Sequence, residues 1–261
     1  PEPDDPPDAI IARVSAHHGS EVALHGDDGE FRVHVQQVDA VGPIAVGDWL
    51  LLDAADRRVR RRFERRTLLS RFAAGEEARP QVIAANVDTA FIVTSCTAEF
   101  SPSRLERYLA MVVQSGAEPV VVLSKADLAD DPADYAARVD ELRPGVAVVV
   151  LDARRPDDAA ALRAWCGPGR SVALLGSSGV GKSTLAATLG AGELATGATR
   201  ARDGTGRHTT TSRSLHRLPS GGVLVDNPGV RELQLPEGEG GVADVFDDVL
   251  ELIAACRFSD C

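Results

Sequence analysis

The hydrophobic pattern changes its period near residue 80, and the two parts of the chain predict different architectures. Before that point, short alternating or β-branched runs are separated by turn-forming Gly and Asp residues, as in the strands of a small β-barrel. The runs expected to form strands cover residues 10–14, 21–24, 31–35 and 48–52. We expect an OB-like barrel, and the pattern alone leaves an SH3-like barrel open.

From residue 87 onward, near-continuous apolar runs alternate with amphipathic segments of helical period. The apolar runs cover residues 87–95, 119–123, 146–151, 171–175 and 222–225. The helical segments cover residues 103–115, 132–142, 157–165 and 182–189, and a last amphipathic stretch lies at 242–255. Apolar strands that alternate with helices predict a parallel sheet covered on both faces, which is an α/β fold.

The composition is that of a globular protein, because 44% of the 261 residues are hydrophobic and 26% are charged. The length favours two domains. The net charge of −11 excludes a uniformly basic nucleic-acid-binding surface, although a local basic patch is compatible with it. No apolar run reaches the ~18 residues needed to span a membrane, and the acidic, Pro-rich residues 1–8 do not resemble a signal peptide. We therefore expect no membrane partner.

Arginine is concentrated in one segment of the chain. Residues 57–71 contain eight arginines against a single acidic residue, Glu64. They are Arg57, Arg58, Arg60, Arg61, Arg62, Arg65, Arg66 and Arg71. Because clustered guanidinium groups bind phosphates through paired hydrogen bonds, we interpret the segment as an RNA contact. A solvated basic face on an acidic protein is the alternative.

A phosphate-binding loop is the strongest motif of the chain. Residues 176–184 match G-x4-G-K-[ST] in full, between an apolar run and a helical segment. The predicted nucleotide-binding residues are Gly176, Ser177, Ser178, Gly179, Val180, Gly181, Lys182, Ser183 and Thr184. In this motif backbone N–H groups enclose the phosphates, the catalytic Lys182 reaches the β- and γ-phosphates, and the Ser183 hydroxyl coordinates Mg²⁺. The motif does not choose between ATP and GTP.

The choice of base depends on residues 124–127, S-K-A-D, a one-residue variant of the guanine motif N-K-x-D. The Asp127 carboxylate can accept hydrogen bonds from guanine N1–H and N2–H₂, whereas adenine has an acceptor at N1 and no N2 amine. Lys125, one of only two lysines in the chain, is expected to lay its aliphatic stem over the base. Ser124 is shorter than the usual Asn, so we expect a weaker link between this loop and the phosphate loop.

Two switch motifs follow the phosphate loop. Asp226 to Gly229 match D-x-x-G, in which Asp226 holds Mg²⁺ through water and the Gly229 N–H senses the γ-phosphate. The polar segment 204–212 has the composition of a mobile switch, and within its threonine run we expect Thr210 to complete the Mg²⁺ shell. The base motif precedes the phosphate loop, and this order implies a circular permutation, which folded domains tolerate because their termini lie at the surface.

Together these motifs resemble the ribosome small-subunit-dependent GTPases, the RsgA or YjeQ family. The resemblance is carried by residues 85–88, 124–127, 176–184, 206–211, 226–229 and 256–261. It implies a tail at 1–9, an OB-fold-like RNA-binding domain at 10–75, a permuted GTPase domain at 80–236 and an incomplete zinc-domain segment at 237–261. It also implies a cytoplasmic enzyme that hydrolyses GTP with Mg²⁺ and binds the 16S rRNA of the 30S ribosomal subunit late in its maturation. We expect a monomer.

The zinc segment departs from the family pattern. The family site resembles C-x4-C-x-H followed by a further Cys, and here only Cys256 and Cys261 represent it. A structural Zn²⁺ takes four ligands, so two cysteines leave the predicted site incomplete. Two free thiols are the alternative for this pair.

The catalytic residues leave more than one mechanism open. Many GTPases orient the attacking water with a Gln directly after D-x-x-G, but Val230 stands there, so we expect a low basal rate. His208 is a candidate replacement, and a surface-loop histidine is the alternative. Two rival functions remain: an RNA-binding assembly factor that uses GTP only as a conformational clamp, and a P-loop ATPase, which Asp127 disfavours.

Overall fold

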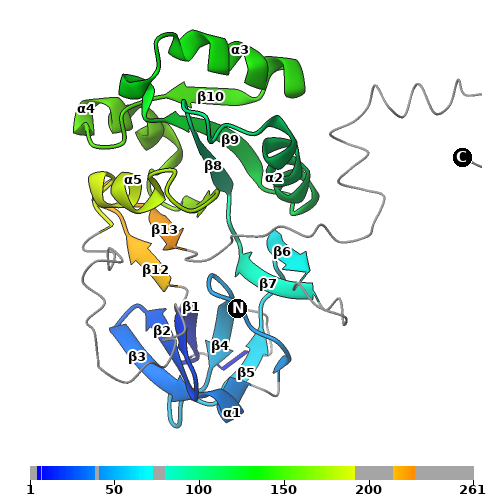
Figure 1. Ribbon diagram of the computed structural model, residues 1–261. Helices are drawn as coiled ribbons and strands as arrows, with labels where there is room; N and C mark the ends of the chain where they lie inside the picture. The colour runs from blue at the N-terminus through cyan, green and yellow to red at the C-terminus, as the bar shows by residue number, and fades with distance from the viewer. Residues whose placement is uncertain (1–4, 7, 39–40, 73–79, 192–213, 227–261) are drawn as a thin grey trace, which may run out of the picture.

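The computed structural model describes residues 5–6, 8–38, 41–72, 80–191 and 214–226. In this part of the chain one 11-stranded sheet runs through the molecule, and a separate two-stranded sheet lies beside it (Figure 1). The N-terminal strands lie at one end of the molecule, and the α/β segment that begins near residue 89 lies at the other. None of the helices in the described ranges combines the length and apolar character needed to cross a membrane.

The N-terminal strands form an antiparallel arrangement around a small apolar core. They are β1 (Ile10–His18), β2 (Glu21–Gly26), β3 (Gly29–His34), β4 (Trp49–Leu52) and β5 (Val59–Arg62). Strand β1 pairs with both β2 and β4, β2 pairs with β3, and β4 pairs with β5. The four strands expected from the sequence are confirmed. Strand β5 was not predicted, because its three arginines remove the hydrophobic pattern of a strand. The described pairings do not include one between β3 and β5, so closure into an OB-like barrel stays a prediction.

The remainder of the sheet is largely parallel, as the apolar runs predict. Its parallel strands are β8 (Thr89–Ser95), β9 (Glu118–Ser124), β10 (Ala147–Val150), β11 (Ser171–Leu175) and β13 (Val223–Asp226). The strand order across the whole sheet is β10-β9-β8-β11-β13, then β12 (Ser214–Arg217), and then β1-β2-β3. The α/β fold is therefore confirmed.

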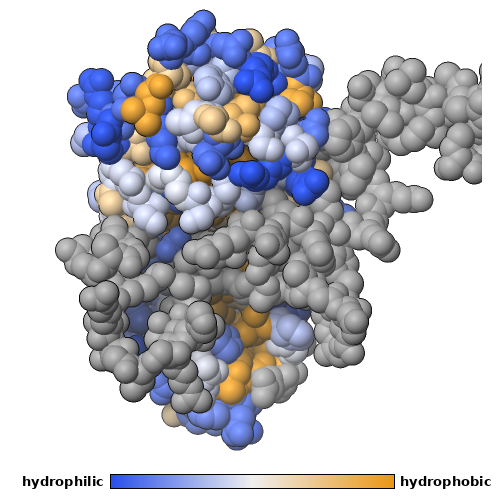
Figure 2. Space-filling model, viewed as in Figure 1, coloured by the Kyte–Doolittle hydropathy of each residue, from blue (hydrophilic) through white to orange (hydrophobic). Residues whose placement is uncertain are grey.

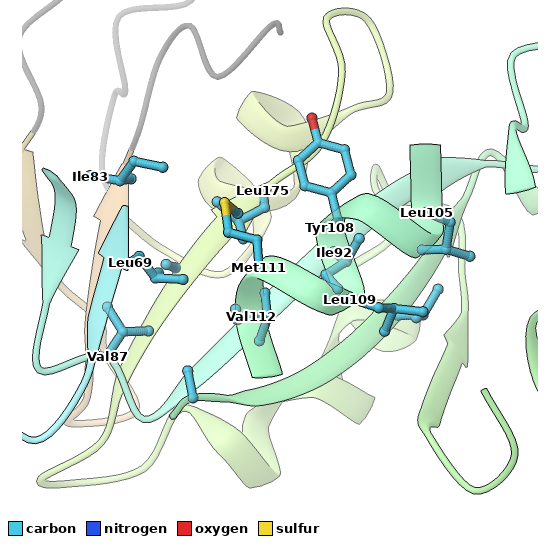
Figure 3. Packing of buried hydrophobic residues seen from close by; sticks show 14 of the residues in the cluster. Leu69, Ile83, Val87, Ile92, Leu105, Tyr108, Leu109, Met111, Val112 and Leu175 are labelled. Carbon is cyan, nitrogen blue, oxygen red and sulfur yellow. The ribbon is translucent and has the colours of Figure 1, made fainter. Parts of the chain in front are cut away.

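Helices cover both faces of the parallel strands. They are α2 (Pro102–Gln114), α3 (Pro132–Leu142), α4 (Pro156–Ala159) with the 3₁₀ turn η3 (Ala160–Trp165), and α5 (Lys182–Thr188). Because strand side chains alternate, Ile92 and Leu175 pack under α2, in the cluster that Figure 3 shows. Phe91 and Leu174 face the other way and pack with Leu185 of α5. The helix expected at 157–165 is found as α4 and η3, so its second half is 3₁₀.

Strand β12 joins the two ends of the molecule. It runs antiparallel to β13, and its first residue, Ser214, also pairs with Ala16 of β1. The sequence did not predict this strand, because S-L-H-R is too short and too polar to show a strand period. The N-terminal strands and the parallel strands thus share one hydrogen-bonded sheet.

The buried side chain of Arg13 also connects the N-terminal strands to the α/β segment. The Arg13 side chain donates from Nε to the Gly47 carbonyl at 3.2 Å and from Nη2 to the Asn86 carbonyl at 3.0 Å. Asn86, in left-handed conformation with φ 55°, donates from Nδ2 to the same Gly47 carbonyl at 3.0 Å. Burial lowers the pKa of Arg13 to about 10, so it remains charged at neutral pH. These bonds tie β1 and the loop before β4 to the segment that enters β8.

The segment between the two regions forms a hairpin that the sequence did not predict. Strands β6 (Leu68–Phe72) and β7 (Pro80–Ala85) pair antiparallel as the two-stranded sheet. The Ala85 N–H at the end of β7 donates to the Val46 carbonyl at 2.9 Å, and the Leu68 N–H donates to the Ser115 carbonyl behind α2 at 3.1 Å. This hairpin therefore contacts both ends of the molecule.

Gly47 provides a test of this junction. Its φ is +97°, and a Cβ atom would lie 2.0 Å from the Ala85 carbonyl oxygen. We expect Gly47→Ala to destabilise the protein by roughly 2–4 kcal/mol, because left-handed strain adds to a backbone clash. Thermal unfolding followed by circular dichroism measures the change.

Gly42→Ala is the matched control. Gly42 also has a positive φ, +76°, but a Cβ there meets nothing within 4 Å, so a loss of only about 1 kcal/mol is expected. Equal losses for the two variants would show that the approach of residue 47 to residue 85 does not matter for stability.

Candidate nucleotide-binding site

The phosphate loop follows strand β11 and packs against a neighbouring strand. Gly176 comes directly after β11 with φ +138°, and a Cβ there would lie 2.2 Å from the Val93 carbonyl oxygen of β8. Only glycine fits this backbone approach. The loop then turns into α5, whose first residue is Lys182. The strand–loop–helix context that the motif requires is therefore present.

Lys182 is folded over its own loop. Its Nζ donates to the Gly176 carbonyl at 2.7 Å and to the Ser177 carbonyl at 2.5 Å. These bonds hold the ammonium group at the centre of the loop, where the backbone N–H groups of the motif are expected to meet phosphate oxygens.

Arg104 reaches the same loop from α2. Its Nη1 donates to the Ser177 hydroxyl at 3.1 Å. Arg104 was not predicted as a site residue, because nothing in the local sequence indicates that the first turn of α2 faces the loop after β11. The sheet order places β8, the strand that leads into α2, directly beside β11.

Ser124 connects the base motif to the phosphate loop. Its hydroxyl, at the end of β9 and buried, lies 2.6 Å from the Val180 carbonyl of the phosphate loop and 3.0 Å from the Thr94 carbonyl of β8. We expected a weaker link because Ser is shorter than Asn. The side chain bonds directly to the phosphate loop, because the two loops approach closely over the end of β8, and the weaker link relative to Asn stays a prediction.

The residues predicted to read guanine follow at the same edge of the sheet. Lys125 adopts a left-handed conformation with φ 54° and leads into the short 3₁₀ turn η2 (Ala126–Leu128). The Asp127 side chain is one third exposed, at 33%. Its Oδ2 accepts a hydrogen bond from Nη2 of Arg154 at 2.8 Å. The predicted base-reading carboxylate is thus accessible to a ligand and has a defined partner.

Asp152 and Arg154 lie in a third loop of the candidate site, which was not predicted from the sequence. They follow β10, the strand beside β9, and the carboxyl ends of adjacent parallel strands meet at one edge of a sheet. The Arg154 side chain donates to both oxygens of Asp152. These bonds hold the pKa of Asp152 at about 2 and raise the pKa of Arg154. A usable signal existed, since D-A-R directly follows an apolar run next to the base motif.

The three loops are packed together. A Cβ built on Gly181 would lie 3.8 Å from both the Ser124 hydroxyl and the Ala153 side chain. Thr188 of α5 donates its hydroxyl to the Ala153 carbonyl at 2.7 Å. A nucleotide that spans the phosphate loop and Asp127 would therefore lie across one continuous surface.

The predicted Mg²⁺ ligands divide between described and undescribed residues. Ser183 lies in the first turn of α5, and Asp226 is the last residue of β13, the strand beside β11. A hydroxyl and a carboxylate at one sheet edge are oxygen donors, which Mg²⁺ prefers. Thr210, His208 and Gly229 lie outside the described residues.

The predicted zinc ligands Cys256 and Cys261 also lie outside the described residues. Within the described ranges, no group of three or more His, Cys, Asp or Glu side chains could hold a metal ion.

Most arginines of residues 57–71 have a carboxylate, carbonyl or ring partner in the folded chain. Arg65 donates to both oxygens of the buried Asp48 at 2.7 Å, and Arg61 pairs with both oxygens of Asp5. The other described partners are Asp53 for Arg60, Asp56 for Arg58, Asp88 for Arg66, the Pro43 carbonyl for Arg62 and the Phe31 ring for Arg57. The side chain of Arg71 is not described.

Among the arginines of this segment whose side chains are described, four are exposed and remain accessible to phosphates: Arg57, Arg58, Arg60 and Arg66. RNA contact by the segment stays a prediction, carried by these four residues.

Comparison with known proteins identifies the family of the chain. A sequence model of the RsgA GTPase family matches residues 62–236. The small ribosomal subunit biogenesis GTPase RsgA 2 of Vibrio parahaemolyticus is 47% identical over 259 residues, 99% of this chain and 72% of that protein. RsgA of Mesorhizobium japonicum is 44% identical over 256 residues, 97% of this chain and 74% of that protein.

Two solved structures share the fold. YjeQ from Thermotoga maritima superposes with a TM-score of 0.67 at 22% identity, over 97% of this chain and 86% of that one. YloQ, described as a circularly permuted GTPase, superposes with a TM-score of 0.65 at 21% identity, over 100% of this chain and 86% of that one. From the motif order, the sheet and these relatives, the chain belongs to the RsgA GTPase family and is a GTP hydrolase.

Proposed function

We propose that this protein hydrolyses GTP to GDP and phosphate as a factor in the late maturation of the 30S ribosomal subunit. The observation that carries the proposal is the hydrogen bond from Ser124 to Val180, because it brings the base motif and the phosphate loop into one site. The relatives are named as small ribosomal subunit biogenesis GTPases, which supports the ribosomal role.

The preference for guanine follows from the position of Asp127. Its carboxylate would accept from N1–H and N2–H₂ of guanine, while adenine would present an acceptor at N1 and offer the carboxylate no hydrogen bond. A P-loop ATPase is therefore disfavoured.

The phosphate chemistry is assigned to charge stabilisation and positioning. Lys182 and the backbone N–H groups of residues 176–184 would stabilise negative charge on the phosphoryl oxygens, and Arg104 would fix Ser177 beside them. Ser183, Asp226 and Thr210 would hold Mg²⁺, which neutralises charge on the β- and γ-phosphates when bound. His208 would orient the attacking water, and the Gly229 N–H would sense the γ-phosphate. With Val230 after D-x-x-G, the basal rate is expected to be low.

The N-terminal strands complete the proposal as an OB-like RNA-binding module. The exposed Arg57, Arg58, Arg60 and Arg66 would contact 16S rRNA phosphates. The functional divisions would be residues 10–75 for RNA and 80–236 for GTP, with a zinc-binding segment at 237–261. A cytoplasmic monomer is consistent with a ribosomal partner.

Stimulation by the ribosome tests the function. GTP turnover should rise by orders of magnitude when 30S subunits are added, because partner proteins raise other GTPase rates by ~10³–10⁵. Phosphate release is measured with 30S and, as the control, with 50S subunits. Equal rates in the two cases would contradict a small-subunit factor.

A measurement of 30S affinity distinguishes GTP hydrolysis as the function from the alternative in which GTP is only a conformational clamp. If GTP acts only as a conformational clamp, 30S affinity will differ between GDP and a nonhydrolysable GTP analogue, while 30S will not accelerate turnover. Equal 30S affinity with GDP and with the GTP analogue would contradict both the hydrolysing switch and the clamp.

Asp127→Asn should change the base preference. An amide at this position can donate to the C2 carbonyl of xanthine but meets the N2 amine of guanine donor to donor, so GDP affinity should fall at least ~100-fold while XDP affinity rises. Competition of GDP, XDP and ADP against a fluorescent nucleotide measures the change. Asp130→Asn, at an exposed acid just outside the motif, is the control and should leave the order unchanged.

Ser124→Ala should weaken the site without changing its base preference. Loss of the bond to the Val180 carbonyl should lower affinity for GDP and GTP alike by about 5- to 30-fold, as expected for one buried hydrogen bond. Ser115→Ala removes a bond of the same type, from a hydroxyl to the Val112 carbonyl at 2.6 Å at the end of α2. Similar affinity losses in both variants would mean that the effect is general destabilisation.

A further inference from the structure

Arg154 joins two carboxylates that belong to different loops. Its Nη2 lies 2.8 Å from Oδ2 of Asp127 and 2.7 Å from Oδ2 of Asp152, and its Nε lies 2.9 Å from Oδ1 of Asp152. The backbone N–H of Arg154 donates to Asp152 as well, at 3.0 Å. One guanidinium therefore stands between the base motif and the loop after β10.

The charges explain why a cation is needed at this point. Asp152 is ionised at neutral pH, because the bonds from Arg154 hold its pKa at about 2. Both carboxylates bond to the same nitrogen atom, so their oxygens are separated by no more than the sum of the two bond lengths. Like charges so close repel each other. Without Arg154, an ionised Asp152 would face Asp127 with no cation between them.

We propose that Arg154 is a positioning residue for guanine recognition, which holds the Asp127 carboxylate in the orientation that reads the N1–H and N2–H₂ edge of the base. The inference rests on the proposed function of Asp127 and names what makes that residue selective. Asp152 holds the Arg154 guanidinium in place, and the guanidinium in turn orients the Asp127 carboxylate.

The acceptor capacity of Asp127 allows for both Arg154 and a guanine base. A carboxylate has about four lone-pair positions, of which Arg154 takes one on Oδ2 and guanine would take two. Arg154 is also tied to Asp152 through its side chain and its backbone, so it keeps its anchor whether or not a base is present. These two features favour a positioning residue over an inhibitory group that must leave before the nucleotide enters.

The test compares two bases that differ at the group in question. GDP carries the N2 amine and inosine diphosphate lacks it. The ratio of their affinities therefore reports how well the Asp127 carboxylate is oriented to accept a hydrogen bond from that amine. In the full chain, Arg154→Ala should lower GDP affinity about 10-fold and inosine diphosphate affinity less, so that the ratio narrows. Competition against a fluorescent guanine nucleotide gives both values.

Rescue separates positioning from a general effect on folding. Asp152→Asn added to Arg154→Ala removes the uncompensated charge and should recover part of the GDP affinity. Arg154→Lys should lose less than Arg154→Ala, since it keeps the cation but not the forked geometry. Arg154 is 66% exposed, so neither variant should change the unfolding temperature much.

Arg155→Ala is the matched control. Arg155 is the next residue, similarly exposed at 67%, and its Nε lies 3.7 Å from Asp158. It should leave both affinities unchanged. If the unmodified protein fails to bind GDP, the proposed function itself is wrong. If the unmodified protein binds GDP, three results for Arg154→Ala would overturn only the role of Arg154. These are an equal loss of affinity for both nucleotides, no change in either affinity, and tighter binding.

Discussion

The hydrogen bond from the Ser124 hydroxyl to the Val180 carbonyl is the contact on which the nucleotide site depends. Ser124 ends β9 and Val180 belongs to the loop after β11, with β8 lying between these strands in the sheet. The same hydroxyl also lies 3.0 Å from the Thr94 carbonyl of β8, so one buried side chain spans three segments. A bond of this kind contributes only about 1 kcal/mol to stability. Its importance is therefore positional: it sets where the base loop lies relative to the phosphate loop.

The rest of the site is built outward from this contact by charge pairing. Lys182 is held over the phosphate loop by two carbonyls, and Arg154 is held over the base loop by Asp152. Both cations are partnered to groups within a few residues of themselves, and both stand where a ligand atom or a reading carboxylate is expected. Hydrogen bonds to residues nearby in sequence thus position Lys182 and Arg154, although the loops of the site lie far apart in sequence.

The nucleotide site is also connected to the N-terminal strands. Ser214 of β12 pairs with Asp226 of β13 on one side and with Ala16 of β1 on the other. Only β12 therefore separates the strand of the predicted Mg²⁺ carboxylate from the N-terminal strands. The buried Arg13, bonded to Gly47 and Asn86, fastens the same junction. This sheet and the Arg13 bonds therefore join the proposed RNA-binding module directly to the strands of the GTP site.

The sequence by itself determined the α/β class, the phosphate loop, the base motif, the permuted order and the first four strands. These depend on residue types at fixed spacing along one segment, which is information that a sequence carries directly. Tertiary structure alone decided the partners of the arginines, since Arg61 meets Asp5 and Arg65 meets Asp48 only after folding. It also decided which atoms Ser124 bonds in the phosphate loop, that Arg104 belongs to the site, and that Arg154 bonds to Asp127. Each of these depends on which loops meet at a sheet edge, and hydrophobic periodicity does not encode the strand order that brings them together.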